Sequence, residues 1–317
     1  MSISVLRTAD AWWVATSTGA ARIETAATTT AELLADRAAV DAAAATEGGE
    51  PIESLALFSP VTAPCRVVAQ MTNFRSHVAD AGMNPDTIPM TFFRKTSGSI
   101  SGPYDDIVKP AHVRLLDYEV EIGIVIGKPV PVGTAITAEN LAQHVAGLVV
   151  TNDVSARDLQ LPKTQFFESK SYPAFTPVGP SLVLLEGDEL KRFADLRLRL
   201  SVNGEVRQDA LVRGDMVFEP LAALQGLSGF QRLDPGDLLL TGTPVGTALS
   251  APPKPIEMIG NLLPPTVRWK AFFKAQARNQ KYLKHGDVVE LSIATDDGAL
   301  DLGSQRTVVR DAGQDSR

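Results

Sequence analysis

The stretch from residue 115 to residue 127 constrains the fold of this chain most, because its side chains alternate with a period of two. Such a pattern predicts a β-strand with one apolar face and one acidic face. Neighbouring carboxylates repel one another unless water or a shared cation compensates their charge. An oxygen-only cluster suits Mg²⁺, Mn²⁺ or Ca²⁺ better than zinc or copper. The alternative is a half-buried strand with a solvated outer face. The apolar face comprises Tyr118, Val120, Ile122, Ile124 and Ile126, and the acidic face comprises Asp117, Glu119 and Glu121.

The composition is that of a folded globular protein, with 317 residues of which 44% are hydrophobic and 21% charged. The formal net charge of −7 argues against nucleic acid and anionic membranes as partners. A single cysteine, Cys65, excludes an internal disulfide and a thiolate zinc cluster. The sequence has neither a signal-peptide pattern nor an apolar run of membrane-spanning length, so we expect a cytoplasmic protein without a membrane partner.

The order of sequence patterns divides the chain into three parts. We expect a small N-terminal α/β domain over residues 1–62, a catalytic domain over 63–312 and a loose tail over 313–317. Residues 30–45 are rich in alanine and predict a helix in the first domain. The second domain consists mainly of strand patterns, interrupted by a proline-rich and helical insert at about 251–285. These features together predict an α+β fold that is rich in β-structure.

A histidine and a carboxylate lie three residues apart in the polar segment that follows the first strand of the second domain. On a helical turn His77 and Asp80 share one face. A carboxylate beside an imidazole fixes its tautomer and raises its basicity, as a general base requires. The alternative is a surface helix that carries the pair without a function.

Other polar residues stand where strands end or where the chain is rich in proline and aromatic residues. Asp153 closely follows a predicted buried strand and is a candidate third ligand for an ion. Lys170 is either an ordinary surface lysine or a cation that holds a developing anion. Thr243, in a Gly-Thr-Pro-Val-Gly segment, is placed with backbone amides that suit an anionic oxygen.

Six motifs, taken in sequence order, resemble the fumarylacetoacetate hydrolase family over about residues 66–309. They are Asn-Phe-x-x-His-x-x-Asp from Asn73, Asp-Tyr-Glu-Val-Glu from Asp117, Asn-Asp-Val-Ser-Ala-Arg-Asp-x-Gln from Asn152, Lys-Ser-Tyr from Lys170, Pro-Val-Gly-Pro from Pro177 and Gly-Thr-Pro-Val-Gly from Gly242. The resemblance implies a mixed β-roll or β-sandwich catalytic domain, usually a homodimer. It also implies Mg²⁺ or Mn²⁺ as cofactor, with Ca²⁺ as a further candidate.

The resemblance implies a metal site and a general base at the matching positions. Glu119, Glu121 and Asp153 would be the metal ligands. His77 would activate water, and Asp80 would orient the imidazole of His77. Asp80 stands where family members usually have a glutamate, which is one methylene longer.

The resemblance also implies residues that bind the substrate and stabilise charge on it. Lys170 and Gln160 would stabilise the developing oxyanion. Arg157 and Thr243 would position the substrate, and we place Lys95, at the end of a predicted strand, in the same group.

Three functions follow as hypotheses. The first is a metal-dependent hydrolase that cleaves a C–C bond in an acylpyruvate-like or β-diketo acid of aromatic or related catabolism. The second is an oxaloacetate-type decarboxylase, or a hydratase or isomerase of 2-oxo-enoates. The third is a metal-stabilised binding or scaffold protein without catalytic activity. The first two imply a small 2-oxo or β-diketo acid as partner.

Overall fold

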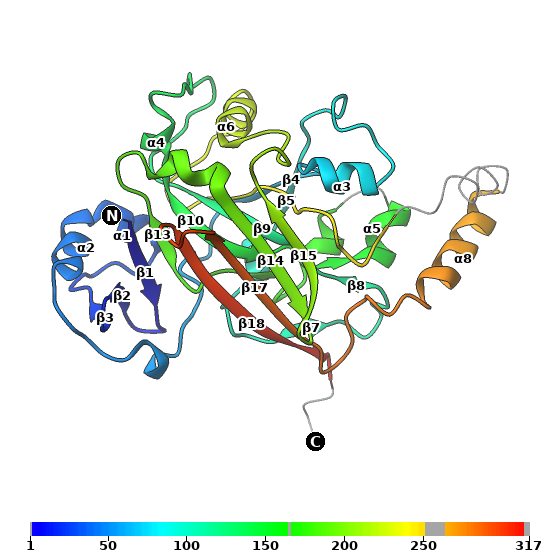
Figure 1. Cartoon of the computed structure of the whole chain (residues 1–317), viewed down its shortest axis with the longest axis horizontal. Helices are drawn as coiled ribbons and strands as arrows, with labels where there is room; N and C mark the ends of the chain where they lie inside the picture. Colours follow the sequence, from blue (N-terminus) through cyan, green and yellow to red (C-terminus); the bar gives the residue numbers. More distant parts are fainter. Residues whose placement is uncertain (1, 164–165, 251–263, 314–317) are drawn as a thin grey trace.

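Two β-sheets pack face to face at the centre of the protein (Figure 1). The structure is a computed structural model that describes residues 2–163, 166–250 and 264–313. In these residues the larger sheet has nine strands in the order β3-β2-β1-β13-β10-β9-β16-β4-β5, and it is mixed because β16 and β4 run parallel. Its strands are β1 (Ile3–Arg7), β2 (Trp12–Thr16), β3 (Gly19–Arg22), β4 (Val67–Gln70), β5 (Phe92–Lys95), β9 (Val120–Ile126), β10 (Val145–Asn152), β13 (Leu182–Leu184) and β16 (Leu238–Leu240).

The second sheet has five strands in the order β15-β14-β17-β18-β7 within the same described residues. Asn203 and Gly204, both with positive φ, form the predicted turn between its strands β14 and β15. Two short pairings, β11 with β8 and β12 with β6, lie outside both sheets. The bounds are β6 (Ile100–Ser101), β7 (Ile107–Lys109), β8 (Leu116–Asp117), β11 (Ser155–Ala156), β12 (Thr176–Pro177), β14 (Leu196–Val202), β15 (Glu205–Leu211), β17 (Val288–Thr295) and β18 (Asp301–Asp311).

Seven helices are described, and they lie at the periphery of the two sheets in Figure 1. The predicted helix over 30–45 is two helices, because the chain breaks at Asp36 after a capping box of Thr29 and Glu32 has started the first. The helices are α1 (Thr30–Ala35), α2 (Arg37–Ala44), α3 (Arg75–Asp80), α4 (Leu141–His144), α5 (Arg157–Lys163), α6 (Pro220–Ser228) and α8 (Pro265–Gln276), with 3₁₀ turns η1 (Ile52–Ser54), η2 (Ser97–Ser99), η3 (Glu168–Lys170) and η4 (Glu189–Asp195).

The apolar face predicted for the central strand lies in the main core. Ile122, Ile124 and Ile126 of β9 belong to one buried cluster with residues of β14 and β17. The opposite face of the large sheet forms a second cluster, which α1 and α2 cover. Strand β9 is therefore buried on both faces, and the alternative of a solvated outer face is wrong: Glu121 is only 1% exposed. A strand of this kind can hold charges only if they are compensated inside the protein.

The N-terminal strands continue the large sheet, because β1 pairs with β13 of the following part of the chain. The boundary near residue 62 stays a prediction. Residues 251–263 of the predicted insert and 314–317 of the predicted tail lie outside the described residues. The described end of the insert contains α8, at the outer edge of the molecule in Figure 1. No helix of the described residues is long and apolar enough to cross a membrane.

Candidate active site

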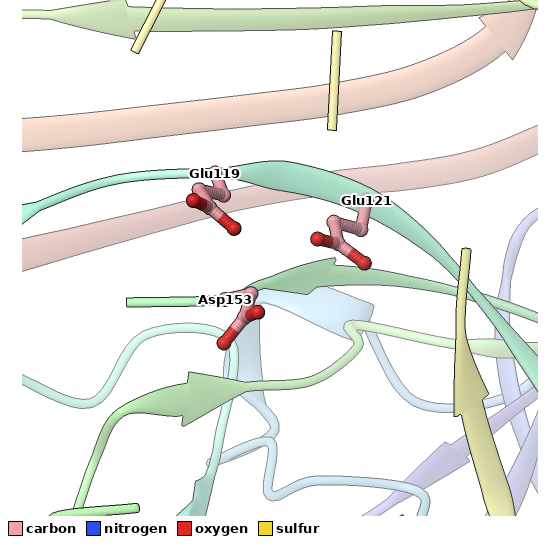
Figure 2. A group of neighbouring side chains, drawn as sticks. All are labelled: Glu119, Glu121 and Asp153. Atoms are coloured by element: carbon pink, nitrogen blue, oxygen red, sulfur yellow. The ribbon is translucent and has the colours of Figure 1, made fainter. Parts of the chain in front are cut away.

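Three carboxylates meet where β9 begins and β10 ends (Figure 2). The two strands are antiparallel neighbours, so Glu119 just before β9 and Glu121 within it lie close to Asp153 just past β10. The backbone N–H of Asp153 donates to the carbonyl of Glu119 at 2.9 Å. One ligand oxygen from each side chain lies within 4.8 Å of the others, and all three residues are buried. The predicted set of ligands is thus assembled by the pairing of two core strands.

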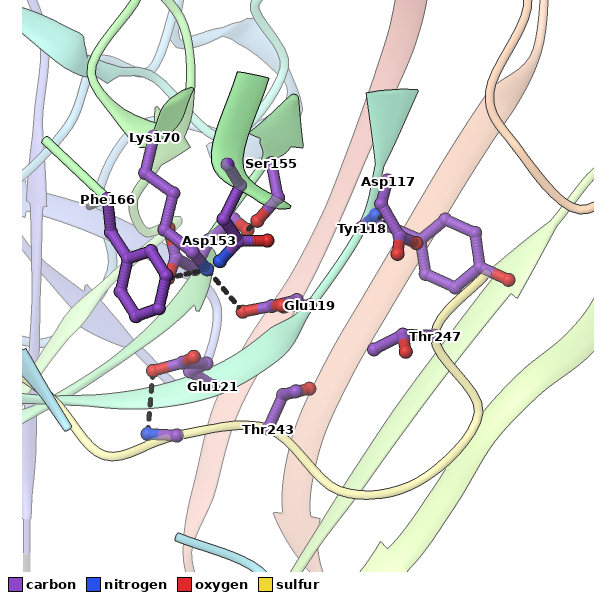
Figure 3. A network of polar contacts seen from close by, with 12 residues as sticks. Asp117, Tyr118, Glu119, Glu121, Asp153, Ser155, Phe166, Lys170, Thr243 and Thr247 are labelled. Atoms are coloured by element: carbon purple, nitrogen blue, oxygen red, sulfur yellow. Dashed lines mark hydrogen bonds and ion pairs between the residues drawn. The ribbon is translucent and has the colours of Figure 1, made fainter. Parts of the chain in front are cut away.

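Buried cations compensate two of these carboxylates, and Figure 3 shows one of these cations, Lys170. The ammonium of Lys170 donates to Glu119 at 2.7 Å and to Asp153 at 2.6 Å. Lys95 pairs with Asp153, and Arg157 pairs with Glu119. Burial alone would raise the pKa of Glu119, but the charges of Lys170 and Arg157 lower it to about 2. Glu119 therefore stays ionised over the physiological range.

Glu121 is the least compensated member of the trio. Among the described residues no basic side chain forms an ion pair with it, and its carboxylate accepts from the backbone N–H of Gly242 at 2.7 Å. Burial, together with the negative charges of Asp153 and Glu119, raises its pKa well above the ordinary value. A hard divalent cation would relieve this repulsion and find only oxygen ligands. The residues present therefore fit Mg²⁺ or Mn²⁺.

His77 lies on the short helix α3, and the charges of Glu119, Arg157 and Lys170 all act on its imidazole. Burial lowers the pKa of His77, while the negative charge of Glu119 opposes that effect. In the described part of the chain the buried Nδ1 has no hydrogen-bond partner, so Asp80 does not hold the tautomer as the motif suggests. Asp80 acts on His77 only through its charge, which raises the pKa.

Residues outside the predicted set hold α3 in place. The carboxylate of Asp215 accepts from the backbone N–H of Ser76 at 2.7 Å and from its hydroxyl at 2.6 Å. Asn73, just before the helix, donates to the carbonyl of Thr241 at 2.8 Å. Gly242 follows Thr241 and has φ +85. A Cβ atom at Gly242 would lie 2.8 Å from the Cβ atom of Asn73, so this close approach requires glycine.

Asp117 belongs to the acidic face of the predicted strand but not to the trio. Its carboxylate accepts from Nε of Arg157 at 2.8 Å and from the backbone N–H groups of Ala248 and Leu249 at 2.8 and 3.0 Å. It therefore joins α5 to the segment that follows Thr243. Its place at the head of the alternating stretch was a visible signal, but Arg157 lies 40 residues away in sequence and Ala248 lies 131 residues away.

The side chains predicted to bind substrate are already engaged within the chain. The hydroxyl of Thr243 donates to the carbonyl of Val120 and accepts from Gln208, each at 2.9 Å. Lys95 donates to the carbonyl of Phe175 as well as to Asp153. These contacts give both residues a positioning role, and direct binding of substrate by either stays a prediction.

Arg157 and Gln160 lie one helical turn apart on α5. The guanidinium of Arg157 pairs with Asp117 and Glu119, and it also donates to the side-chain oxygen of Gln160 at 2.8 Å. Gln160 lines a cavity of about 730 Å³, which is a usual size for a small-molecule site. Helix α5 thus contacts the acidic trio through Arg157 and lines the neighbouring cavity through Gln160. The cavity is lined by Met71, Thr91, Phe92, Phe93, Arg94, Gln160, Leu161, Phe166 and Phe167.

Comparison with known proteins identifies the family. A family model described as fumarylacetoacetate (FAA) hydrolase, C-terminal, matches residues 66–310. The chain belongs to the fumarylacetoacetate hydrolase family. The match includes every residue of the predicted site, and it confirms the resemblance found in the sequence.

Members of the fumarylacetoacetate hydrolase family with different activities resemble this chain. The oxaloacetate tautomerase Fahd2a of Rattus norvegicus, described as mitochondrial, is 36% identical over 204 residues, or 64% of this chain and 63% of the rat protein. The match therefore spans less than two thirds of that relative.

Solved structures of the family match nearly the whole chain. A probable 2-hydroxyhepta-2,4-diene-1,7-dioate isomerase from Mycobacterium abscessus matches with a TM-score of 0.74 and 30% identity, covering 98% of this chain and 99% of that one. A fumarylacetoacetate hydrolase from Exiguobacterium antarcticum matches with a TM-score of 0.70 and 26% identity, covering 98% and 100%. The β-rich, mixed fold expected for the family is thus confirmed.

Proposed function

We propose that this protein is a divalent-metal-dependent hydrolase that cleaves a C–C bond in an acylpyruvate-like or β-diketo acid. The observation that carries the proposal is the buried trio of Glu119, Glu121 and Asp153 with the ammonium of Lys170 against two of its members. A metal site beside a fixed cation suits a substrate that develops negative charge at two carbonyl groups.

In the proposed mechanism the trio would hold Mg²⁺ or Mn²⁺. When bound, the ion would supply Lewis acidity toward a 2-oxo acid and so favour departure of an enolate. The chain itself provides the base: the lowered pKa of His77 keeps its imidazole neutral, and a neutral imidazole accepts a proton from water. Lys170 would stabilise the oxyanion formed when that water adds to the carbonyl group, with Gln160 as a second donor.

A substitution of the base tests this function. The protein loaded with Mg²⁺ should hydrolyse acetylpyruvate to acetate and pyruvate, and His77→Ala should abolish that hydrolysis. Metal binding, measured by calorimetry, should survive in the variant because His77 is not among the ligands. The exchange His285→Ala removes an exposed imidazole from the turn before β17 and serves as control. Hydrolysis at the original rate by His77→Ala would refute the proposed role.

The similarity to oxaloacetate tautomerases favours a second candidate, a tautomerase, decarboxylase or isomerase acting on oxaloacetate-like acids or 2-oxo-enoates. None of these reactions consumes a hydrolytic water. Analysis of the products from oxaloacetate and acetylpyruvate separates the candidates: acetate and pyruvate from acetylpyruvate support the hydrolase, whereas turnover of oxaloacetate alone supports the second candidate. The homodimer and the cytoplasmic location stay predictions, which size-exclusion chromatography with light scattering and cell fractionation would test.

A further inference from the structure

We propose that the cavity beside the acidic trio receives an apolar acyl group, so that this protein selects 2-oxo acids with an apolar distal end over those with a second carboxylate. The inference rests on the proposed function for the identity of the bound head group. It adds the class of substrate, which neither the family nor the metal site defines.

The cavity adjoins the trio because both lie along the same end of the large sheet. Phe93 of β5 has its ring centroid 5.3 Å from the ammonium of Lys170, the same ammonium that pairs with Glu119. Phe166 packs edge-on against Phe93 with the ring centroids 5.2 Å apart. A ligand whose carbonyl group lies at Lys170 therefore extends next into a space walled by these two rings.

The wall of the cavity is suited to an apolar group. Most of its lining residues are aromatic or aliphatic, and Arg94 supplies the single formal charge among the lining residues described. The side chain of Arg94 is exposed to solvent, so water screens its attraction for a carboxylate. A distal carboxylate here would lose water without a well-placed cation in return, whereas an alkyl or aryl group would gain from burial.

Two substrates that differ only at their far end test the inference. They are 2,4-dioxoheptanoate, which ends in a methyl group, and 2,4-dioxoheptanedioate, which ends in a carboxylate. Calorimetry with the Mg²⁺-loaded His77→Ala variant, which should not cleave either acid, measures their binding. We expect the methyl-ended acid to bind about tenfold more tightly or better, as for burial of a small apolar group. Equal or tighter binding of the diacid, or no binding of either acid, would overturn the inference.

Substitutions in the wall locate the effect. Phe166→Lys should lower the preference for the methyl-ended acid about tenfold or invert it, whereas Phe166→Leu should preserve it. Val206→Lys adds the same charge at an exposed position on β15 outside the cavity and should leave the preference unchanged. If Phe166→Lys fails to fold, Leu161→Lys places the charge on α5 instead. An unchanged preference in a folded lysine variant of the wall would overturn the inference.

The test separates this inference from the proposed reaction. Tight binding of the methyl-ended acid without acetylpyruvate hydrolysis would contradict the hydrolase and leave the cavity's role intact. Hydrolysis of acetylpyruvate together with a preference for the diacid would support the hydrolase and contradict the proposed role of the cavity.

Discussion

Lys170 is buried between two members of the trio, where its charge is fixed and water is excluded. Lys170→Met keeps the length of the side chain but removes its charge. We expect kcat on a 2-oxo acid to fall by about 10²–10³, as for loss of one oxyanion donor. Steady-state kinetics measures the effect. Lys163→Met, which removes an exposed lysine paired with Glu168, is the matched control and should leave kcat unchanged. A similar kcat in both variants would exclude Lys170 from catalysis.

The protonation of His77 should shape the dependence of activity on pH. Burial lowers its pKa from the ordinary 6.5, and the negative charge of Glu119 opposes part of that shift. The neutral imidazole is the active form, so kcat/KM should rise with pH through a midpoint below 6.5 and then level off.

A second pH profile isolates the role of Asp80. Its charge raises the pKa of His77, so Asp80→Asn should move the acid midpoint of kcat/KM further down. An upward shift, or an acid midpoint above 6.5 in the unaltered protein, would contradict the assignment of His77 as the base.

At the level of secondary structure, helix α3 has six residues and depends on its contacts to stay in place. Asp215→Ala removes both side-chain hydrogen bonds to Ser76, which are worth about 1–3 kcal/mol. We expect hydrogen exchange of the α3 amides to speed up and kcat/KM to fall about tenfold, because His77 is less often in place.

Asp86 supplies the control for this prediction. It forms an exposed ion pair with Arg75 of the same helix, so Asp86→Ala should change neither quantity appreciably. Unchanged hydrogen exchange in Asp215→Ala would show that other contacts position α3.

Strand β9 and the position of its two glutamates on one face could be predicted because their signals are local. The alternation from 117 to 126 marked β9, and the carboxylates at 119 and 121 fell on one face of it. The partners of Asp117, Asp215 and Gln208 could not be predicted, since those contacts join segments about 30 to 140 residues apart. The missing hydrogen bond between His77 and Asp80 could not be predicted either, because the spacing of three places both residues on one helical face but does not fix how the imidazole is turned.

The stability of the protein as a whole should depend on the metal, although its folding should not. Lys170, Arg157 and Lys95 already compensate much of the negative charge of the trio, so a chelator should leave the circular dichroism at 25 °C unchanged. Mg²⁺ or Mn²⁺ at a hundred times its Kd should stabilise the fold by about 2.7 kcal/mol and raise Tm.

Thermal unfolding with and without metal measures this effect. Glu121→Gln removes the least compensated ligand, so its Tm should respond much less to either ion. Two results would contradict the proposed metal site: unfolding when a chelator is added, or a Tm of the unaltered protein that changes with neither Mg²⁺ nor Mn²⁺.

The pairing of β1 with β13 has a consequence for any shortened form of the chain. Without its first 62 residues, β13 would become a bare edge with unpaired backbone amides and carbonyls beside Leu182 and Leu184, which are buried in the full chain. Such an edge invites a strand from another molecule. By pairing with β13, the N-terminal strands thus prevent this edge from pairing with a strand of another molecule.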